Sequence, residues 1–174
     1  GWVMGSDGVR AKDGVRLEFT VICRSGTATD GFIAQVITSY LSQVGIKINT
    51  EEYASSTWRA KMYDGDYELG IGGYITSPGA TRTKMYAIGG ALNRGGWENQ
   101  AFTDLCAKID KELDAEARKA QVAEALTYFD SELPQIVIYA NNEIIVVNEK
   151  LRGFSPNPTN MTNFCQSAGW WLAE

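Results

Sequence analysis

The chain has 174 residues, 44% of them hydrophobic, which is enough for one well-buried core of α/β size and short for two. Its formal net charge is −5 and its Lys and Arg residues are scattered, so we expect no nucleic-acid partner. It contains no histidine, which excludes Ser-His-Asp and Cys-His nucleophile pairs and zinc sites built on histidine.

Three cysteines, Cys23, Cys106 and Cys165, form an odd set without Cys-x-x-Cys spacing. At most one internal disulfide can form. We expect buried or free thiols, because Cys23 lies in an apolar strand pattern and Cys106 on an apolar helix face. No apolar run approaches the roughly 20 residues that span a bilayer, and the first residues are not a signal peptide. The sequence therefore predicts an excised soluble piece of a protein.

The first part of the chain alternates predicted strands and helices. Residues 1–16 predict an extended arm bent by two Asp-Gly turns, and residues 17–23 alternate as a strand. Apolar residues at three- and four-residue steps predict a helix from Asp30 to Val44, ended by Gly45. Three shorter elements follow: a strand at 46–50, a helix at 56–63 and a strand at 67–71. This alternation favours a βαβ-type layered sheet.

Two further helices and two β-rich runs are predicted after a glycine-rich middle. Asp114 separates the helices as an N-cap, and Pro134 ends the second one. Runs 135–139 and 143–147 predict a hairpin, and the tail from Gly153 is irregular until Trp170. The apolar stripes of the helices are Phe102, Leu105, Cys106, Ile109 and Leu113 in the first, and Val122, Ala125, Leu126, Phe129 and Leu133 in the second.

A glycine-rich loop after the strand at 67–71 is the first candidate site. The glycines from Gly70 lack the third glycine of a dinucleotide-binding motif, because Ile75 stands there. Ligands in α/β sheets collect where loops leave the carboxyl ends of strands. Tyr74 can stack on a ligand there, and Thr76 and Ser77 offer hydroxyls. The alternative is a glycine-rich turn with one packed aromatic residue.

A second candidate is the loop with Arg94 and Trp97, where a guanidinium and an indole fit ligand capture by hydrogen bonding and stacking. Trp97 fits a core anchor equally well. Carboxylates four residues apart, such as Asp110 and Asp114, fit a solvated helix face better than an acid–base pair.

Several segments together resemble the second, ligand-capping lobe of the oligopeptide/dipeptide (peptide/nickel) class of extracytoplasmic solute-binding proteins of ABC importers. No single motif is diagnostic, but their order and spacing match the family over nearly the whole chain. These segments are Gly1-Trp2, Asp7 to Val9, Lys12 to Phe19, Ile33 to Ile48, Asp66 to Tyr74, Asn99 to Leu105, and Arg118 to Tyr139.

The resemblance implies an α/β fold: a layered mixed β-sheet with packing helices, as in one lobe of a periplasmic-binding-protein-like (type II) fold. Residues 1–174 would form a single ligand-capping lobe with an entry arm at 1–16. The tail at 154–174 packs on this lobe or belongs to the other one. Such a protein works outside the cytoplasm, in the periplasm or lipid-anchored at the cell surface.

The resemblance also implies a function without catalysis: two lobes close on a solute, which an ABC permease then receives. The expected partners are a small solute, most simply a peptide, the missing first lobe and the permease, with no cofactor and no metal site. The loop from Tyr74 to Pro78 lacks the acidic residue that often binds a peptide's amino terminus in this family, so a sugar or a metal chelate is the alternative. A more distant alternative is that the chain is an α/β enzyme that works without histidine.

The interface with the first lobe should come from the loops after the predicted strands, around residues 25–27, 74–77, 94–97 and 139–142. The ligand-binding candidates are Tyr74, Ile75, Thr76, Ser77, Arg94, Trp97, Tyr139 and Asn141.

Overall fold

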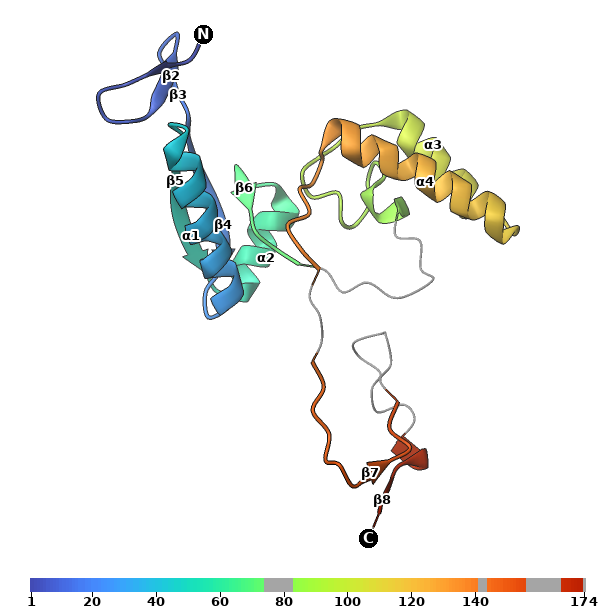
Figure 1. Ribbon diagram of the computed structural model, residues 1–174. Helices are drawn as coiled ribbons and strands as arrows, with labels where there is room; N and C mark the ends of the chain where they lie inside the picture. Colours follow the sequence, from blue (N-terminus) through green and yellow to red (C-terminus); the bar gives the residue numbers. More distant parts are fainter. Residues whose placement is uncertain (74–82, 141–143, 156–166, 174) are drawn as a thin grey trace. The chain divides into compact units, whose positions relative to one another are not determined.

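The structure is a computed structural model that describes residues 1–73, 83–140, 144–155 and 167–173. It divides the chain into two compact units, Gly1–Gly73 and Tyr74–Glu174, whose α-helices and most of whose strands are labelled in Figure 1. Among the described residues, no helix combines the length and apolar character needed to cross a membrane.

The first unit opens with a small antiparallel sheet of three strands: β1 (Val3–Met4), β2 (Arg10–Lys12) and β3 (Val15–Arg16). Asp13 and Gly14 have positive φ values of 52° and 82°, so the second Asp-Gly pair makes the tight turn predicted for it. The backbone N–H of Arg10 donates to the carbonyl of Gly45 at 2.8 Å, and its Nε donates to that of Val44. These bonds attach the arm to the turn that ends helix α1.

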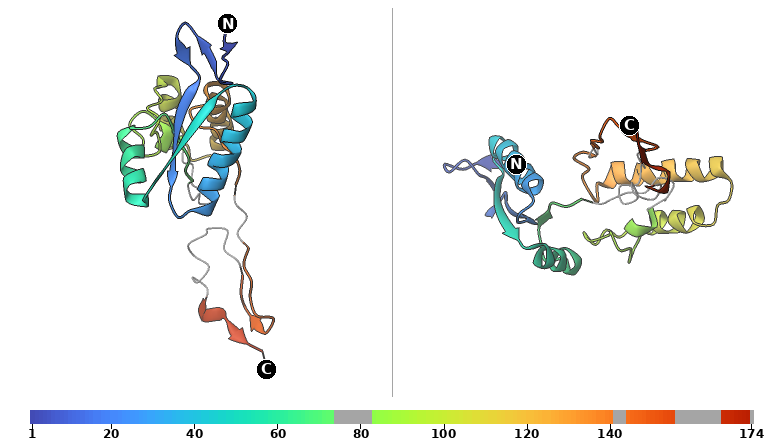
Figure 2. Two further views of the ribbon diagram at one scale, coloured as in Figure 1. Left: turned by 90° about the vertical axis from the view of Figure 1, so that its left-hand side faces the viewer. Right: turned by 90° about the horizontal axis from the view of Figure 1, so that it is seen from below.

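A parallel sheet forms the centre of this unit, with strand order β5-β4-β6. Its strands are β4 (Glu18–Arg24), β5 (Lys47–Tyr53) and β6 (Leu69–Gly70). Helices α1 (Ala28–Gln43) and α2 (Ser55–Asp64) lie on opposite faces of this sheet (Figure 2, left). The predicted βαβ alternation is therefore confirmed, with boundaries shifted by a few residues at most.

Each sheet face has its own core. Val21, Cys23 and Ile48 pack with Ala34 of α1 on one face, and Ile22 packs with Trp58 and Met62 of α2 on the other. The buried Cys23 is a free thiol, as expected, and burial raises its pKa. Alternate residues of the central strand β4 thus face different helices, which is the period of two expected of a strand buried on both sides.

Two glycines, one at the end of β6 and one just after it, permit close packing against α2. A Cβ atom at Gly70 would lie 2.4 Å from Sδ of Met62, and one at Gly72 would lie 2.9 Å from the ring of Trp58. Gly72 therefore needs to be glycine because the indole lies against its backbone. This close approach explains part of the glycine-rich pattern without a nucleotide ligand.

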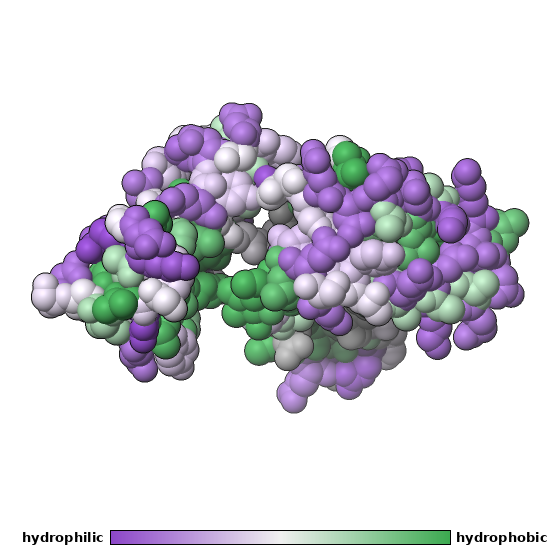
Figure 3. All heavy atoms as spheres, turned by 90° about the horizontal axis from the view of Figure 1, so that it is seen from above, coloured by the Kyte–Doolittle hydropathy of each residue, from purple (hydrophilic) through white to green (hydrophobic). Residues whose placement is uncertain are grey.

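The second unit contains the 3₁₀ turn η1 (Thr83–Tyr86) and the helices α3 (Gln100–Ile109) and α4 (Ala115–Glu132). The predicted cap is confirmed, since Oδ1 of Asp114 accepts from the N–H of Ala117 at 2.8 Å. Hydrophilic side chains predominate over the helical pair in Figure 3. The buried core of the second unit comprises Ala87, Phe102, Leu105, Cys106, Ile109 and Ala125.

Three residues predicted on the apolar stripes are exposed instead. Leu113 is 94% exposed because α3 ends at Ile109, before the stripe reaches it. Leu126 and Leu133 are 54% and 61% exposed. The periodicity identified the helices correctly, but it carried the stripes past the end of each helix and, at Leu126, overestimated the width of the buried face.

The predicted hairpin is absent from the described residues 135–140 and 144–148, which contain no strand, and residues 141–143 lie outside the described ranges. A β-rich run becomes a strand only when another strand satisfies its backbone, and no described residue pairs with these runs. Further on, β7 (Leu151–Arg152) pairs with β8 (Trp171–Leu172) beside η2 (Ser167–Gly169).

Candidate ligand-binding site

The carboxyl ends of all three parallel strands of the first unit lie at one edge of the sheet, where α/β proteins bind ligands. The N–H of Ser25 donates to the carbonyl of Tyr53 at 2.8 Å, and the N–H of Ile71 donates to that of Ile22 at 3.0 Å. These bonds hold together the ends of the strands that lead into the Ser25-Gly26 turn and into residues 71–73. We call this region the carboxyl edge.

Arg24, the last residue of β4, is the best-positioned polar group at the carboxyl edge. Its Nε and Nη2 donate to the two carboxylate oxygens of Asp30, at 2.7 and 3.1 Å. Asp30, in the first turn of α1, is 4% exposed. The hydrogen bond with this carboxylate raises the pKa of Arg24, and the side chain retains 30% exposure. Such a two-point bond fixes the guanidinium in one plane.

Trp58 links Arg24 to the glycine-rich loop. The carbon at the centre of the Arg24 guanidinium lies 5.1 Å from the centre of the indole, in a cation–π contact. The backbone of Gly72 lies against the same ring. Arg24 and the start of the first candidate loop therefore share one aromatic neighbour.

The other charged groups on this face of the sheet are paired with one another. Lys61 forms an ion pair with Asp66 at 2.5 Å and lies 5.1 Å from the centre of the Tyr53 ring. The Tyr53 hydroxyl donates to Glu51 at 2.6 Å, which raises the pKa of the phenol. Arg24 has donor capacity left over at the carboxyl edge, because its Nη1 has no hydrogen-bond partner within the described ranges.

The sequence-predicted site residues fall into two groups. Tyr74, Ile75, Thr76, Ser77 and Asn141 lie outside the described residues. Arg94, Trp97 and Tyr139 belong to the second unit, where Arg94 is half-buried and Tyr139 is 47% exposed. Their part in ligand binding stays a prediction.

Trp97 has a structural role in the second unit. Its Nε1 donates to Oε2 of Glu132 at 2.6 Å, and its ring lies 4.7 Å from that of Phe102 and 5.4 Å from that of Phe129. Asn93 holds the loop by accepting from the N–H of Trp97 at 2.8 Å and donating to its carbonyl. These contacts fit the core-anchor alternative for Trp97.

Sequence reasoning missed Arg24, Asp30 and Trp58. The signal was a charged residue at the end of a buried strand, directly before the Ser25-Gly26 turn, with an acid six residues later in the first turn of a helix. Sequence spacing does not show that a tryptophan from a separate helix lies beneath that arginine. Within the described ranges, no group of three or more Cys, Asp or Glu side chains could hold a metal ion.

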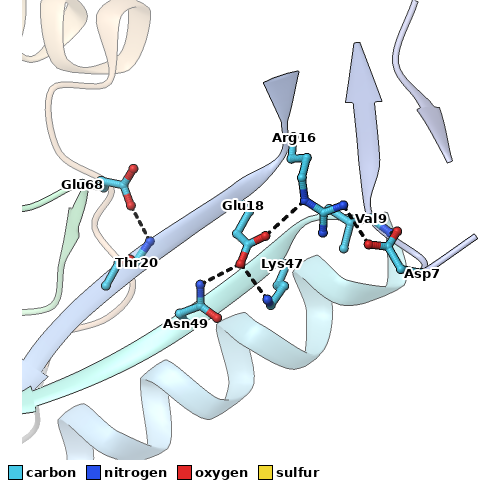
Figure 4. Close-up of polar contacts among 8 residues, drawn as sticks. All are labelled: Asp7, Val9, Arg16, Glu18, Thr20, Lys47, Asn49 and Glu68. Atoms are coloured by element: carbon cyan, nitrogen blue, oxygen red, sulfur yellow. Dashed lines mark hydrogen bonds and ion pairs between the residues drawn. The ribbon is translucent and has the colours of Figure 1, made fainter. Parts of the chain in front are cut away.

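A second polar cluster lies at the amino end of the sheet and holds the arm in place (Figure 4). Oε1 of Glu18 accepts from Lys47 at 2.6 Å and from Asn49 at 3.1 Å, while Oε2 pairs with Arg16 at 3.2 Å. Arg16 also pairs with Asp7 of the arm at 2.7 Å. The cluster therefore connects the small antiparallel sheet to the parallel one.

Glu18 should make stability acid-dependent. Its hydrogen bonds to Lys47, Asn49 and Arg16 lower its pKa to about 2, against about 4.3 for an unpaired glutamate. Its contribution is present above the unfolded pKa and is lost as pH falls through the folded one. The free energy of unfolding, measured with urea at pH values from 6 to 2.5, should fall less steeply below pH 4.5 in Glu18→Gln than in the unaltered protein. Glu124→Gln, at an exposed position of α4, should leave the pH dependence of the free energy of unfolding unchanged. The same pH dependence in both variants would contradict the role given to Glu18.

Comparisons with known proteins agree with this architecture. The family described as bacterial extracellular solute-binding proteins, family 5 middle, matches residues 1–96. The nickel-binding protein NikA of Staphylococcus aureus is 26% identical over 161 residues, 85% of this chain and 32% of that protein. The oligopeptide-binding protein AppA of Bacillus subtilis is 23% identical over 181 residues, 100% of this chain and 33% of its own. This chain spans about a third of the length of both relatives.

The structure of AppA in complex with a nonapeptide superimposes with a TM-score of 0.83 at 22% identity, covering 100% of this chain and 35% of that one. A likeness at this identity shows the fold. The α/β class expected from the sequence, a part of a type II binding-protein fold, is thereby confirmed.

Proposed function

This chain belongs to the bacterial extracellular solute-binding proteins of family 5, as its motifs predicted, and we propose that it forms one lobe of a peptide-capturing protein of an ABC importer. The observation that carries peptide capture is the match of the whole chain to AppA, whose structure holds a nonapeptide. The proposal assigns this lobe binding without turnover, because members of the family are solute-binding proteins.

The carboxyl edge supports this function because it presents one oriented guanidinium beside the start of a glycine-rich loop. Loops at such edges bind ligands in α/β proteins. In a two-lobed protein, closure would place this edge against the other lobe and shield the ligand's hydrogen bonds from water. The predicted ligand residues Tyr74, Ile75, Thr76 and Ser77 follow directly after Gly73 in the sequence.

The β-rich runs of the second unit support a partner lobe. Ile136 and Val137 are 74% and 77% exposed, and Ile144 and Val146 are 86% and 90% exposed. Side chains of this kind are normally buried, and their backbone needs pairing. We propose that these runs complete strands with the first lobe of the same protein, and that residues 154–174 join that lobe as well. The protein would act outside the cytoplasm and deliver its solute to a membrane permease.

Thermal unfolding of the full-length protein against di- to pentapeptides tests peptide capture. A ligand that binds only the folded protein stabilises it by about 2.7 kcal/mol at a hundredfold excess over Kd, so the midpoint should rise with peptides. The present chain alone should show little or no rise, because it holds only one side of the proposed site. Rises only with nickel chelates or sugars would overturn peptide capture; the chelates are included because NikA binds nickel.

A further inference from the structure

We propose that Arg24 determines specificity at the carboxyl edge, and that it selects peptides carrying a carboxylate at the position that faces it. This inference rests on the proposed function and names the chemistry of its substrate. Its basis is the geometry of three side chains, Arg24, Asp30 and Trp58. None of them is among the site residues predicted from the sequence.

Arg24 is held as a rigid donor. Asp30 fixes the edge formed by Nε and Nη2, and the indole of Trp58 contacts the guanidinium in a cation–π interaction. A free arginine side chain loses much rotamer freedom when it binds a ligand, but here the carboxylate and the ring have already removed that freedom. The protein therefore presents the remaining donors of Arg24 in a preorganised position.

The remaining donors suit a carboxylate. Nη1 of Arg24 has no hydrogen-bond partner within the described ranges, and the side chain is 30% exposed. A guanidinium donates only and stays charged, so a group that satisfies it best is an anionic oxygen. The negative charge of Asp30 partly offsets the positive charge of Arg24. Recognition of a ligand carboxylate therefore depends on the geometry of the hydrogen bonds more than on long-range electrostatic attraction.

The neighbouring acids do not compete for these donors. On the α2 face, Glu51 accepts from Tyr53 and Asp66 pairs with Lys61. Glu52 lies on the opposite face, near Gly31 of α1. Arg24 also shares Trp58 with Gly72, which precedes the predicted ligand residues in the sequence by two positions.

The test measures Kd by calorimetry for the full-length protein with tetrapeptide pairs that differ in one carboxylate. Ala-Glu-Ala-Ala is compared with Ala-Gln-Ala-Ala, and further pairs place the Glu or Gln at each of the other positions of the tetrapeptide. A last pair compares Ala-Ala-Ala-Ala with the same peptide carrying a C-terminal amide. One pair should differ by about tenfold in favour of the acid, as expected for a charge-assisted hydrogen bond. The pair that differs tells whether a side chain or the terminal carboxylate contacts Arg24.

Two variants assign the preference to Arg24. Arg24→Lys keeps the charge but loses the planar fork, and the double variant Arg24→Gln with Asp30→Asn keeps a neutral hydrogen-bonded pair. Both should reduce the ratio of Kd values between the neutral and the acidic peptide to less than threefold, whatever their effect on the affinity for neutral peptides. Lys61→Gln removes a cation from the same face and should leave the preference unchanged.

The outcomes separate this inference from the proposed function. Binding of every peptide without a preference for any acid would overturn the inference and leave peptide capture standing. An acid preference that survives both Arg24 variants would overturn it as well. Absence of binding by all the peptides would overturn peptide capture, and the inference with it.

Discussion

Replacing Phe102 with alanine should destabilise the second unit by about 3–5 kcal/mol, the range found for large aromatic side chains removed from cores. Phe102 is completely buried, and its ring lies 4.7 Å from that of Trp97 and 5.5 Å from that of Phe129. Alanine would leave a cavity among rings that cannot collapse together without moving α4 against α3. Urea unfolding of the full-length protein, followed by far-UV circular dichroism, measures the loss.

Phe32→Ala is the matched control, because it removes the same atoms from a site on α1 that is 66% exposed. It should change stability by less than about 0.5 kcal/mol, as surface substitutions usually do. A loss below 1 kcal/mol for Phe102→Ala would show that Phe102 does not anchor the packing of α3 on α4.

The elements of the fold could be read from the sequence because each had a local cause. The helix at α4 begins where Asp114 caps it, and the turn between β2 and β3 forms because Asp13 and Gly14 adopt positive φ. The predicted hairpin failed for a reason outside local sequence, since Ile136 and Ile144 have strand chemistry but no described strand to pair with. Strand formation needs a partner, and a single sequence segment does not reveal one.

The candidate site could be read only in part. The glycine-rich stretch was singled out because it follows a predicted strand, and the structure places Gly72, directly after that strand, at the carboxyl edge. The contact between Arg24 and Trp58 joins residues 34 positions apart in different elements, and no periodicity predicts it. Trp97 left two interpretations open, and the sequence does not reveal its hydrogen bond to Glu132 or its ring contacts, which fit a core anchor.

Asp30→Ala should lower the free energy of unfolding by about 3 kcal/mol. The substitution breaks a largely buried ion pair and leaves the Arg24 guanidinium without the two carboxylate oxygens that accept its hydrogen bonds. The cost falls at the low end for buried pairs, since the Arg24 side chain is 30% exposed and can turn toward water. Urea unfolding of the full-length protein gives the value. Asp64→Ala, at the exposed end of α2, is the matched control and should cost little.

A double-mutant cycle separates the two reasons for keeping this pair. If Asp30 only stabilises the fold, then Arg24→Met with Asp30→Ala should recover most of the stability, because an apolar pair removes the unpaired charge. Recovery with loss of the acid preference would mean that the pair is kept for its ligand rather than for stability. Failure to recover would show that the charge pair itself holds the end of β4 to the first turn of α1, and the carboxyl edge would then depend on it for its shape.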